Sequence, residues 1–220
     1  MKTFLPLFLL SLLLFSCETD NYEKGDGTYS GMTADFGELY ANGQKQGVSF
    51  MTDEGVNYIL EKAVTASWIK TADSTYRTTI YYNKVKEGVA SIVSCSNMPT
   101  LKIRDASAYT KQPQDPLGVE SSWLSKNGKY LNLGLLLKNG RDSEGHEGTH
   151  ALGIILDELH QNGDNTQTAY CRLLHDQGNA PEYYTNRRYV SILLPTTSRP
   201  DSIRLTIKTY EGLMVKTMKL

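Results

Sequence analysis

The chain has 220 residues, in which 23 Lys and Arg side chains almost balance 24 Asp and Glu side chains, for a formal net charge of −1. Proteins that bind nucleic acid usually concentrate basic side chains on one face, whereas here the basic residues are spread along the chain among carboxylates. The composition therefore argues against a nucleic-acid partner, and the length allows one large domain or two small ones.

Residues 1–16 have the pattern of a bacterial lipoprotein signal peptide. Lys2 supplies a positive charge, the segment from Phe4 to Phe15 is almost wholly apolar, and Leu14-Phe15-Ser16-Cys17 has the spacing of a lipoprotein cleavage site. The apolar run of about twelve residues is shorter than the roughly twenty that a membrane-spanning helix needs. We expect cleavage before Cys17 and lipid attachment to that cysteine, with an ordinary signal peptide as the alternative.

The next segment, residues 17–27, is predicted to be a flexible tether. It is rich in charged residues and glycine and has almost no apolar side chain to bury. With the lipid, it would act as a spacer between a membrane and the folded part of the chain. We therefore expect a lipid-anchored protein of the bacterial cell envelope, at the outer membrane, on a face that the sequence does not indicate.

The first half of the folded part shows the two-residue alternation that is typical of β-strands. A turn at residues 52–55 separates two alternating segments and predicts a β-hairpin. We expect a continuous series of strands before residue 97. The segments that carry this prediction are 29–38, 48–50 with 56–60, 64–68, 76–82 and 89–95.

A change of composition divides the folded part in two. Residues 97–118 contain Pro99, Pro113, Pro116 and Gly118, which interrupt any regular strand ladder. We therefore predict one domain over residues 28–108 and a second over residues 109–220.

The second domain has the clearer strand pattern. Apolar residues alternate in short segments, and turns rich in Gly, Asn and Asp separate them. About seven short strands in roughly a hundred residues are typical of two antiparallel sheets packed face to face, a β-sandwich. The segments are 131–137, 152–156, 171–173, 189–194, 203–207 and 213–215.

Several of these segments together resemble the NigD-like lipoproteins of gut-type bacteria. The resemblance implies an OB-like β-barrel over residues 28–108 and an antiparallel β-sandwich over residues 109–220, and it implies no established activity. The residues that carry it are the signal ending at Cys17, Asp115-Pro116-Leu117, Trp123, Tyr130-Leu131-Asn132-Leu133, His150, Leu173-Leu174-His175, and the segment Tyr189-Val190-Ser191-Ile192-Leu193-Leu194-Pro195.

One motif favours a catalytic alternative. His146-Glu147-Gly148-Thr149-His150 matches the HExxH pattern of zinc peptidases, in which a helix places two imidazoles on the metal and the Glu activates water. Four glycines lie in or beside the motif, and the residues before it offer no apolar face for a helix. The position of the third ligand in the extended motif is Leu156, with His160 and His175 as substitutes that nothing else supports. We therefore expect a loop leading to a strand at His150.

Other candidate sites are weaker. Cys95 and Cys171 could form a disulfide in an oxidising compartment, but their apolar surroundings favour two buried free thiols. Tyr76, Tyr81 and Tyr82 would stand on one barrel strand, where OB-like folds often bind oligosaccharide, although tyrosine is also common in strands without a ligand.

These observations leave three classes of function. The leading one is a lipid-anchored, non-catalytic binding or interaction module without cofactor or metal, whose partner is a glycan or an envelope protein. The second is a zinc metallopeptidase that uses His146-Glu147-Gly148-Thr149-His150. The third is a purely structural component of the envelope.

Overall fold

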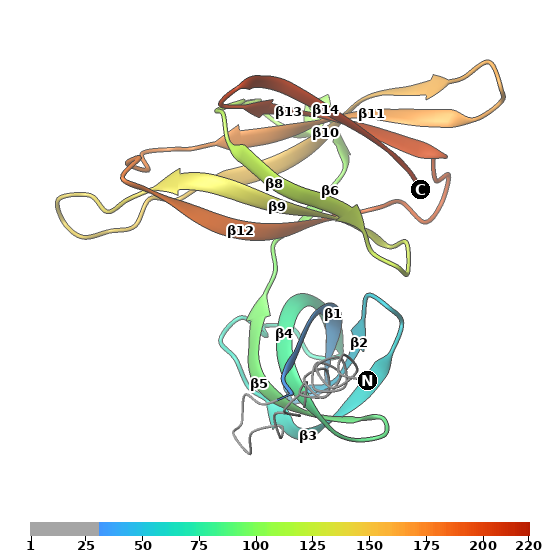
Figure 1. Cartoon of the computed structure of the whole chain (residues 1–220), viewed down its shortest axis with the longest axis vertical. Coiled ribbons are helices and arrows are strands. Elements are labelled where there is room, and N and C mark those ends of the chain that lie inside the picture. The colour runs from blue at the N-terminus through green and yellow to red at the C-terminus, as the bar shows by residue number, and fades with distance from the viewer. Residues whose placement is uncertain (1–30) are drawn as a thin grey trace, which may run out of the picture. The chain divides into compact units, whose positions relative to one another are not determined.

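The computed structural model describes residues 31–220, of which Thr33–Leu220 forms one compact unit (Figure 1). The predicted signal peptide, Cys17 and the tether over residues 17–27 lie outside the described residues. Within the described part, no helix is long and apolar enough to cross a membrane. Almost all of its regular structure is β-strand, as the alternation predicts, with one short 3₁₀ turn, η2, at Ala106–Ala108.

The first five strands close into a barrel. The order around the barrel is β1-β2-β3-β5-β4, and β1 closes the ring by pairing antiparallel with β4. Alternate side chains point inward, so that Leu39, Phe50, Ile80 and Tyr82 form a buried core. The strands are β1 (Thr33–Ala41), β2 (Gly47–Thr52), β3 (Asn57–Val64), β4 (Ser74–Lys86) and β5 (Val89–Asn97).

The predicted hairpin and most predicted barrel strands are confirmed, and one is wrong. β2 and β3 pair antiparallel across the turn at residues 52–55. The alternation over residues 64–68 does not extend a strand, because β3 ends at Val64 and the chain turns, with the Ile69 N–H donating to the Ala66 carbonyl at 3.1 Å. Trp68 instead packs edge-on against Tyr76 on the barrel, with ring centroids 5.6 Å apart.

The chain leaves the barrel earlier than the expected limit at residue 108. β5 ends at Asn97, and the two short strands that follow pair with strands of the second half of the chain. β6 (Thr100–Lys102) pairs with β12, and β7 (Arg104–Asp105) pairs with β10. The predicted range 28–108 therefore includes two segments that complete the sheets of the other half.

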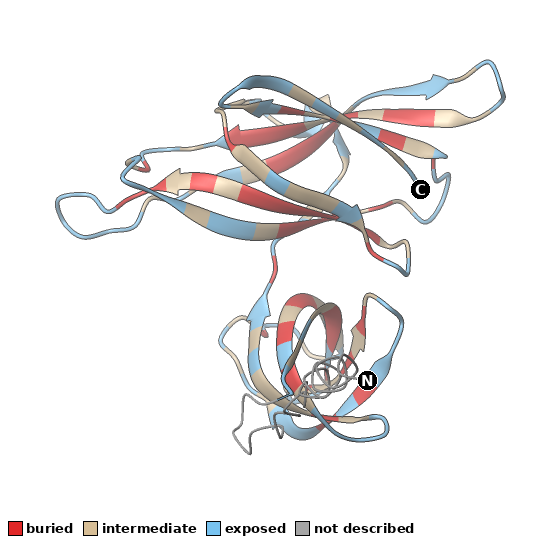
Figure 2. Ribbon diagram, viewed as in Figure 1, coloured by how far each residue is buried: buried red, intermediate tan, exposed pale blue. Residues whose placement is uncertain are grey.

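The second half consists of two sheets that share one core, and we call it the two-sheet half (Figure 1). One sheet has the order β14-β13-β11-β10-β7 and the other β6-β12-β9-β8. Figure 2 shows buried stretches along the central strands of both sheets and along the barrel strands. The strands are β8 (Gly118–Leu124), β9 (Tyr130–Asn139), β10 (Ala151–Gln161), β11 (Gln167–Asp176), β12 (Tyr184–Leu193), β13 (Ser202–Thr209) and β14 (Gly212–Lys219).

The two sheets are mixed rather than purely antiparallel as predicted. β11 and β13 run parallel, as do the pairs β6–β12 and β7–β10. The physical reason is the path of the chain: β12 belongs to the other sheet, so the chain crosses over and returns before it forms β13 beside β11. The predicted alternation itself is confirmed, since Leu131, Leu133 and Leu135 of β9 are fully buried in the shared core.

The barrel packs against the outer face of the four-stranded sheet through a buried arginine. Arg77 lies on the outer face of β4 and is only 5% exposed. Its guanidinium donates to the Asp53 carboxylate, at 2.7 Å from Nη2 to Oδ2, to Asn132 Oδ1 at 3.0 Å and to Ser191 Oγ at 3.0 Å. Asp53 belongs to the barrel, whereas Asn132 and Ser191 belong to β9 and β12. The buried charge is therefore paired and hydrogen-bonded across the two halves.

A second polar contact reinforces the first. Glu38 of β1 is buried and accepts hydrogen bonds from Lys129 Nζ at 2.6 Å and from the Tyr130 hydroxyl. Burial, followed by the bond to Glu38, raises the pKa of Tyr130, so that its hydroxyl stays protonated and donates. The Tyr130 ring also lies 4.1 Å from the Arg77 guanidinium carbon. These contacts explain why β9 is buried on both faces.

Candidate functional site

A cleft of roughly 430 Å³ lies between the barrel and the four-stranded sheet, and we call it the aromatic cleft. Its barrel wall comes from β1, β4 and the β2–β3 turn, and its opposite wall comes from β8, the β8–β9 turn and β12. The side chains that line it and carry the argument are Phe36, Asp53, Tyr81, Trp123, Lys126 and Tyr189.

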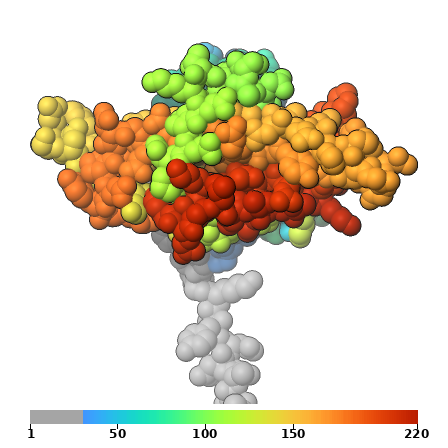
Figure 3. All heavy atoms as spheres, turned by 90° about the horizontal axis from the view of Figure 1, so that it is seen from above, coloured from blue at the N-terminus to red at the C-terminus, as the bar shows by residue number. Residues whose placement is uncertain are grey.

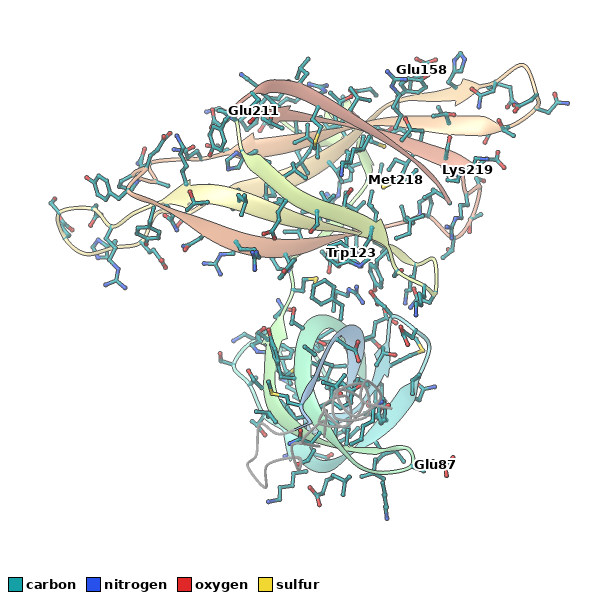
Figure 4. The ribbon with its side chains drawn as sticks, viewed as in Figure 1. Glu87, Trp123, Glu158, Glu211, Met218 and Lys219 are labelled. Carbon is teal, nitrogen blue, oxygen red and sulfur yellow. The ribbon has the colours of Figure 1, made fainter. Side chains whose placement is uncertain are left out.

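Three aromatic rings from separate strands meet in this cleft. Phe36 stacks on Trp123 with ring centroids 5.5 Å apart, and Tyr189 meets both rings at their edges, 5.2 Å from Phe36 and 6.2 Å from Trp123. Trp123 extends from β8 toward the barrel (Figure 4). Trp123 is still 36% exposed and Tyr81 is 38% exposed, so part of each ring is open to a ligand. Packing between the rings holds the open faces in place.

Polar groups surround the rings. The Asp53 carboxylate lines the cleft and accepts a hydrogen bond from the Arg77 guanidinium. Glu54 pairs with Lys126 across the cleft mouth, and the hydrogen bond and charge of Lys126 lower the pKa of Glu54. Apolar rings with a few fixed polar groups are the usual composition of a small-molecule binding site.

The predicted tyrosine platform on β4 is only partly present. Tyr82 points into the barrel, is 1% exposed and donates to Asp35 Oδ2 at 2.8 Å. Tyr76 packs against Trp68 and exchanges hydrogen bonds with the Thr71 backbone. Only Tyr81 reaches the aromatic cleft. Sequence reasoning missed Phe36 and Tyr189, although an aromatic residue opposite in parity to the buried Val190 and Ile192 was a usable signal for Tyr189.

The HExxH motif does not form a helix. Residues 146–150 belong to a loop between β9 and β10 that projects at the end of the two-sheet half opposite the β10–β11 turn, as the yellow and light orange ends in Figure 3 show. An isolated bridge joins Arg141 to Glu147. Gly148 is required for packing, since a Cβ there would lie 2.3 Å from the Ala180 Cβ. The predicted loop is confirmed, but it includes His150, which we expected on the strand, because β10 begins only at Ala151. The zinc alternative lacks the helix that would place both imidazoles on a metal.

The two histidines of the motif have separate environments. His146 is exposed and lies 3.3 Å from Asp142, whereas Nδ1 of His150 lies 2.9 Å from Nε2 of the buried His175. Nδ1 of His175 lies 3.0 Å from the Asp115 carbonyl, which can only accept a hydrogen bond. Nδ1 of His175 must therefore carry a proton, and Nε2 of His175 shares one hydrogen bond with Nδ1 of His150. Among residues 31–220, no group of three or more His, Cys, Asp or Glu side chains is placed to hold a metal.

The protonation of His150 is suppressed in this pair. Burial, followed by the neighbouring His175, lowers the pKa of His150, and the Lys138 backbone opposes this in part.

The two described cysteines are free thiols, as expected. Cys95 lies on β5 of the barrel and Cys171 is buried in the core of the two-sheet half. Burial raises the pKa of Cys95 to about 11 and that of Cys171 to about 12, so both stay protonated at neutral pH.

Solved structures of bacterial proteins share this fold. A NigD-like immunity protein from Bacteroides caccae ATCC 43185 has 22% sequence identity and a TM-score of 0.65, over 84% of this chain and 91% of that one. A protein described as toxin-related, from Parabacteroides distasonis ATCC 8503, has 15% identity and a TM-score of 0.63, over 86% and 93% of the two chains. The resemblance to NigD-like proteins is therefore confirmed in the fold.

A third solved structure shares the fold. It is a candidate lipoprotein from Bacteroides fragilis NCTC 9343, with 11% identity and a TM-score of 0.56, over 85% of this chain and 97% of that one. No protein-family model matches the sequence, and no curated protein is significantly similar to it.

The low pKa of His150 predicts a pH-dependent stability. Below about pH 6.5 the unfolded state binds a proton that the folded state resists, so the contribution of neutral His150 is present above that pH and is lost as pH falls toward the folded value. We expect the free energy of unfolding in urea to fall less for His150→Asn than for the unchanged chain between about pH 7.5 and about pH 5.5.

Asparagine is the replacement of choice because its amide offers both a donor and an acceptor to Nε2 of His175. His146→Asn, in the same loop but exposed, is the control for removing a histidine. Equal pH dependence in the unchanged chain and His150→Asn would contradict the assignment.

Proposed function

We propose that this chain is a lipid-anchored lipoprotein of the bacterial cell envelope that acts as a non-catalytic binding module, with the aromatic cleft as its binding site. The observation that carries the proposal is the cleft itself, where stacking on Phe36 fixes Trp123 while part of its ring stays open, and the exposed ring of Tyr81 lines the same cleft. A ring that packing already holds in place costs little to organise on binding.

The ligand class that fits the cleft best is a neutral glycan. The flat faces of sugar rings carry C–H groups that pack on aromatic rings, and sugar hydroxyls bond to carboxylates and side-chain hydroxyls. The cleft offers both, with Trp123 and Tyr81 as ring surfaces and Asp53 and Ser121 as polar partners. Its volume of roughly 430 Å³ lies within the usual range for small-ligand sites of about 300–1,000 Å³.

We further assign an OB-like fold to the barrel and a β-sandwich to the two-sheet half. Support for the barrel comes from its strand order β1-β2-β3-β5-β4, with β3 parallel to β5 and β1 closing on β4. Support for the sandwich comes from the single core that both sheets share. The aromatic cleft lies on the outer face of β1 and β4, so it uses the junction between the halves rather than the barrel interior.

The proposed location rests on the signal pattern over residues 1–16 and on Cys17. The fold shared with a candidate lipoprotein from Bacteroides fragilis supports it. We propose the outer membrane as the site of anchoring.

Replacing Cys17 tests the anchor. We expect Cys17→Ala to abolish the incorporation of labelled fatty acid in a bacterial host and to shift the protein from the membrane fraction to the soluble fraction. Cys95→Ala is the matched control and should label and fractionate like the unchanged chain. Fatty-acid labelling that persists in Cys17→Ala would refute lipid attachment at this residue.

Replacing Trp123 tests the cleft. We expect a glycan array to yield a neutral oligosaccharide ligand, and Trp123→Ala to weaken its binding in calorimetry by about tenfold, or ~1.4 kcal/mol. Tyr183→Ala removes a more exposed ring outside the cleft and should leave the affinity unchanged. No glycan ligand, or a glycan affinity that Trp123→Ala does not alter, would count against the proposed site.

A further inference from the structure

One edge of strand β12 is unpaired over residues 184–190. On one side it pairs with β9 along the whole strand, from Tyr184 to Leu193, without a register shift. On the other side it pairs with β6 only at Ser191, Ile192 and Leu193. Residues 184–190 therefore form a free sheet edge next to an established parallel pairing.

The free edge exists because the chain leaves the sheet at Pro99. The Ser191 N–H donates to the Pro99 carbonyl at 3.0 Å, but Pro99 has no N–H to donate in return. The residues before it turn away into the barrel, since Asn97 is the last residue of β5. The connection between the two halves therefore leaves open the position beside β12 that a longer β6 would fill.

The backbone groups on this edge have no partner in the described part of the chain. Successive residues of a strand direct their N–H and C=O groups to opposite sides, so Thr185, Arg187 and Tyr189 face the same side as Ser191. Within residues 31–220, the N–H groups of Arg187 and Tyr189 donate no hydrogen bond. A row of unpaired groups of this kind is a template for another strand.

A cleft of roughly 630 Å³ runs beside this edge, and we call it the edge cleft. Apolar side chains at the open end of the two-sheet half line one wall, namely Leu137, Leu152 and Val190. Exposed polar residues of the barrel, Ser96 and Asn97, line the other. The β9–β10 loop completes the lining with residues 147–150, of which Glu147 accepts a hydrogen bond from the Tyr184 hydroxyl. A strand in the cleft would therefore meet an apolar wall with one face and a polar wall with the other.

The edge cleft also contains a cation without a carboxylate partner. Arg188 has the parity of Val190, lines the cleft and is exposed. Its neighbour Arg187 pairs with Glu120, but no ion pair of the described residues includes Arg188. The positive charge of Arg188 also helps to lower the pKa of His150. A carboxylate on the ligand would therefore gain a charge-assisted partner here.

We propose that the edge cleft binds an extended polypeptide segment of a partner protein, which adds a strand to β12 beside Thr185–Tyr189 and places an acidic side chain against Arg188. The incoming strand continues the sheet in the position that β6 leaves at Pro99. Backbone hydrogen bonds to Arg187 and Tyr189 supply affinity, while Leu137, Leu152 and Arg188 select the alternate side chains. This site goes beyond the aromatic cleft, which neither Arg187 nor Arg188 lines.

The test separates backbone from side-chain recognition at one position. Random linear peptides displayed on phage are selected against the purified full chain, and the enriched peptide is synthesised for calorimetry. We expect enriched peptides to carry Asp or Glu and to bind Arg187→Ala like the unchanged chain. Arg187→Pro, which also removes the edge N–H but leaves the β9 ladder intact, should bind about tenfold more weakly. Arg188→Gln should weaken binding by a similar factor.

A second experiment changes the peptide instead of the protein, so that its result does not depend on the folding of Arg187→Pro. N-methylation of the peptide backbone at alternate residues should abolish binding in one parity and leave it unchanged in the other, because only one set of peptide N–H groups faces β12. The proposal is overturned if no peptide is enriched, if N-methylation in either parity has no effect, or if Arg187→Ala weakens binding as much as Arg187→Pro. None of these results depends on glycan binding at Trp123.

Discussion

The arrangement of this protein depends on one buried guanidinium. Arg77 is placed on the outer face of a barrel strand, where a solvated side chain would be ordinary, yet the four-stranded sheet covers it. Removing a charge from water is unfavourable unless it is paired and hydrogen-bonded, and here Asp53, Asn132 and Ser191 supply the partners. Loss of a partner from such a pair costs about 3–5 kcal/mol, so the contact strongly favours a single position of the barrel on the sheet.

Both clefts follow from that contact. The outer faces of β4 and β12 meet at the arginine, and both clefts are lined by residues of these two strands. Thr79, Tyr81 and Tyr189 line the aromatic cleft and the edge cleft alike. The connection at Pro99, which carries the chain from barrel to sheet, also leaves the edge of β12 open. Both proposed binding surfaces thus lie where the two halves meet.

Much of the fold was predictable because burial follows parity. Leu131, Leu133 and Leu135 alternate in the sequence and lie in the core, and the glycines around residues 140–153 correctly indicated a loop rather than a metal-binding helix. Parity tells which face a residue occupies but not what covers that face. Asn132, on the face of β9 opposite the core leucines, is fully buried, which the alternation does not indicate.

What could not be predicted involves partners far apart in the chain. Arg77 meets Asp53, Asn132 and Ser191 across sequence separations of 24, 55 and 114 residues. The pairing of β6 and β7 with strands of the two-sheet half could not be predicted either, because such short strands show too little alternation to indicate their partners. The aromatic cleft was only half visible, since Trp123 and Tyr81 stood out in the sequence while Phe36 and Tyr189 did not.

The central claim is that the buried arginine couples the two halves into one cooperative unit, and the two tryptophans allow a direct measurement. Trp68 reports on the barrel and Trp123 on the four-stranded sheet, so Trp123→Phe and Trp68→Phe leave one fluorescent probe in each half. In urea unfolding followed by tryptophan fluorescence, the account predicts the same midpoint for both variants. Two separated midpoints, with one half unfolding while the other stays folded, would contradict it.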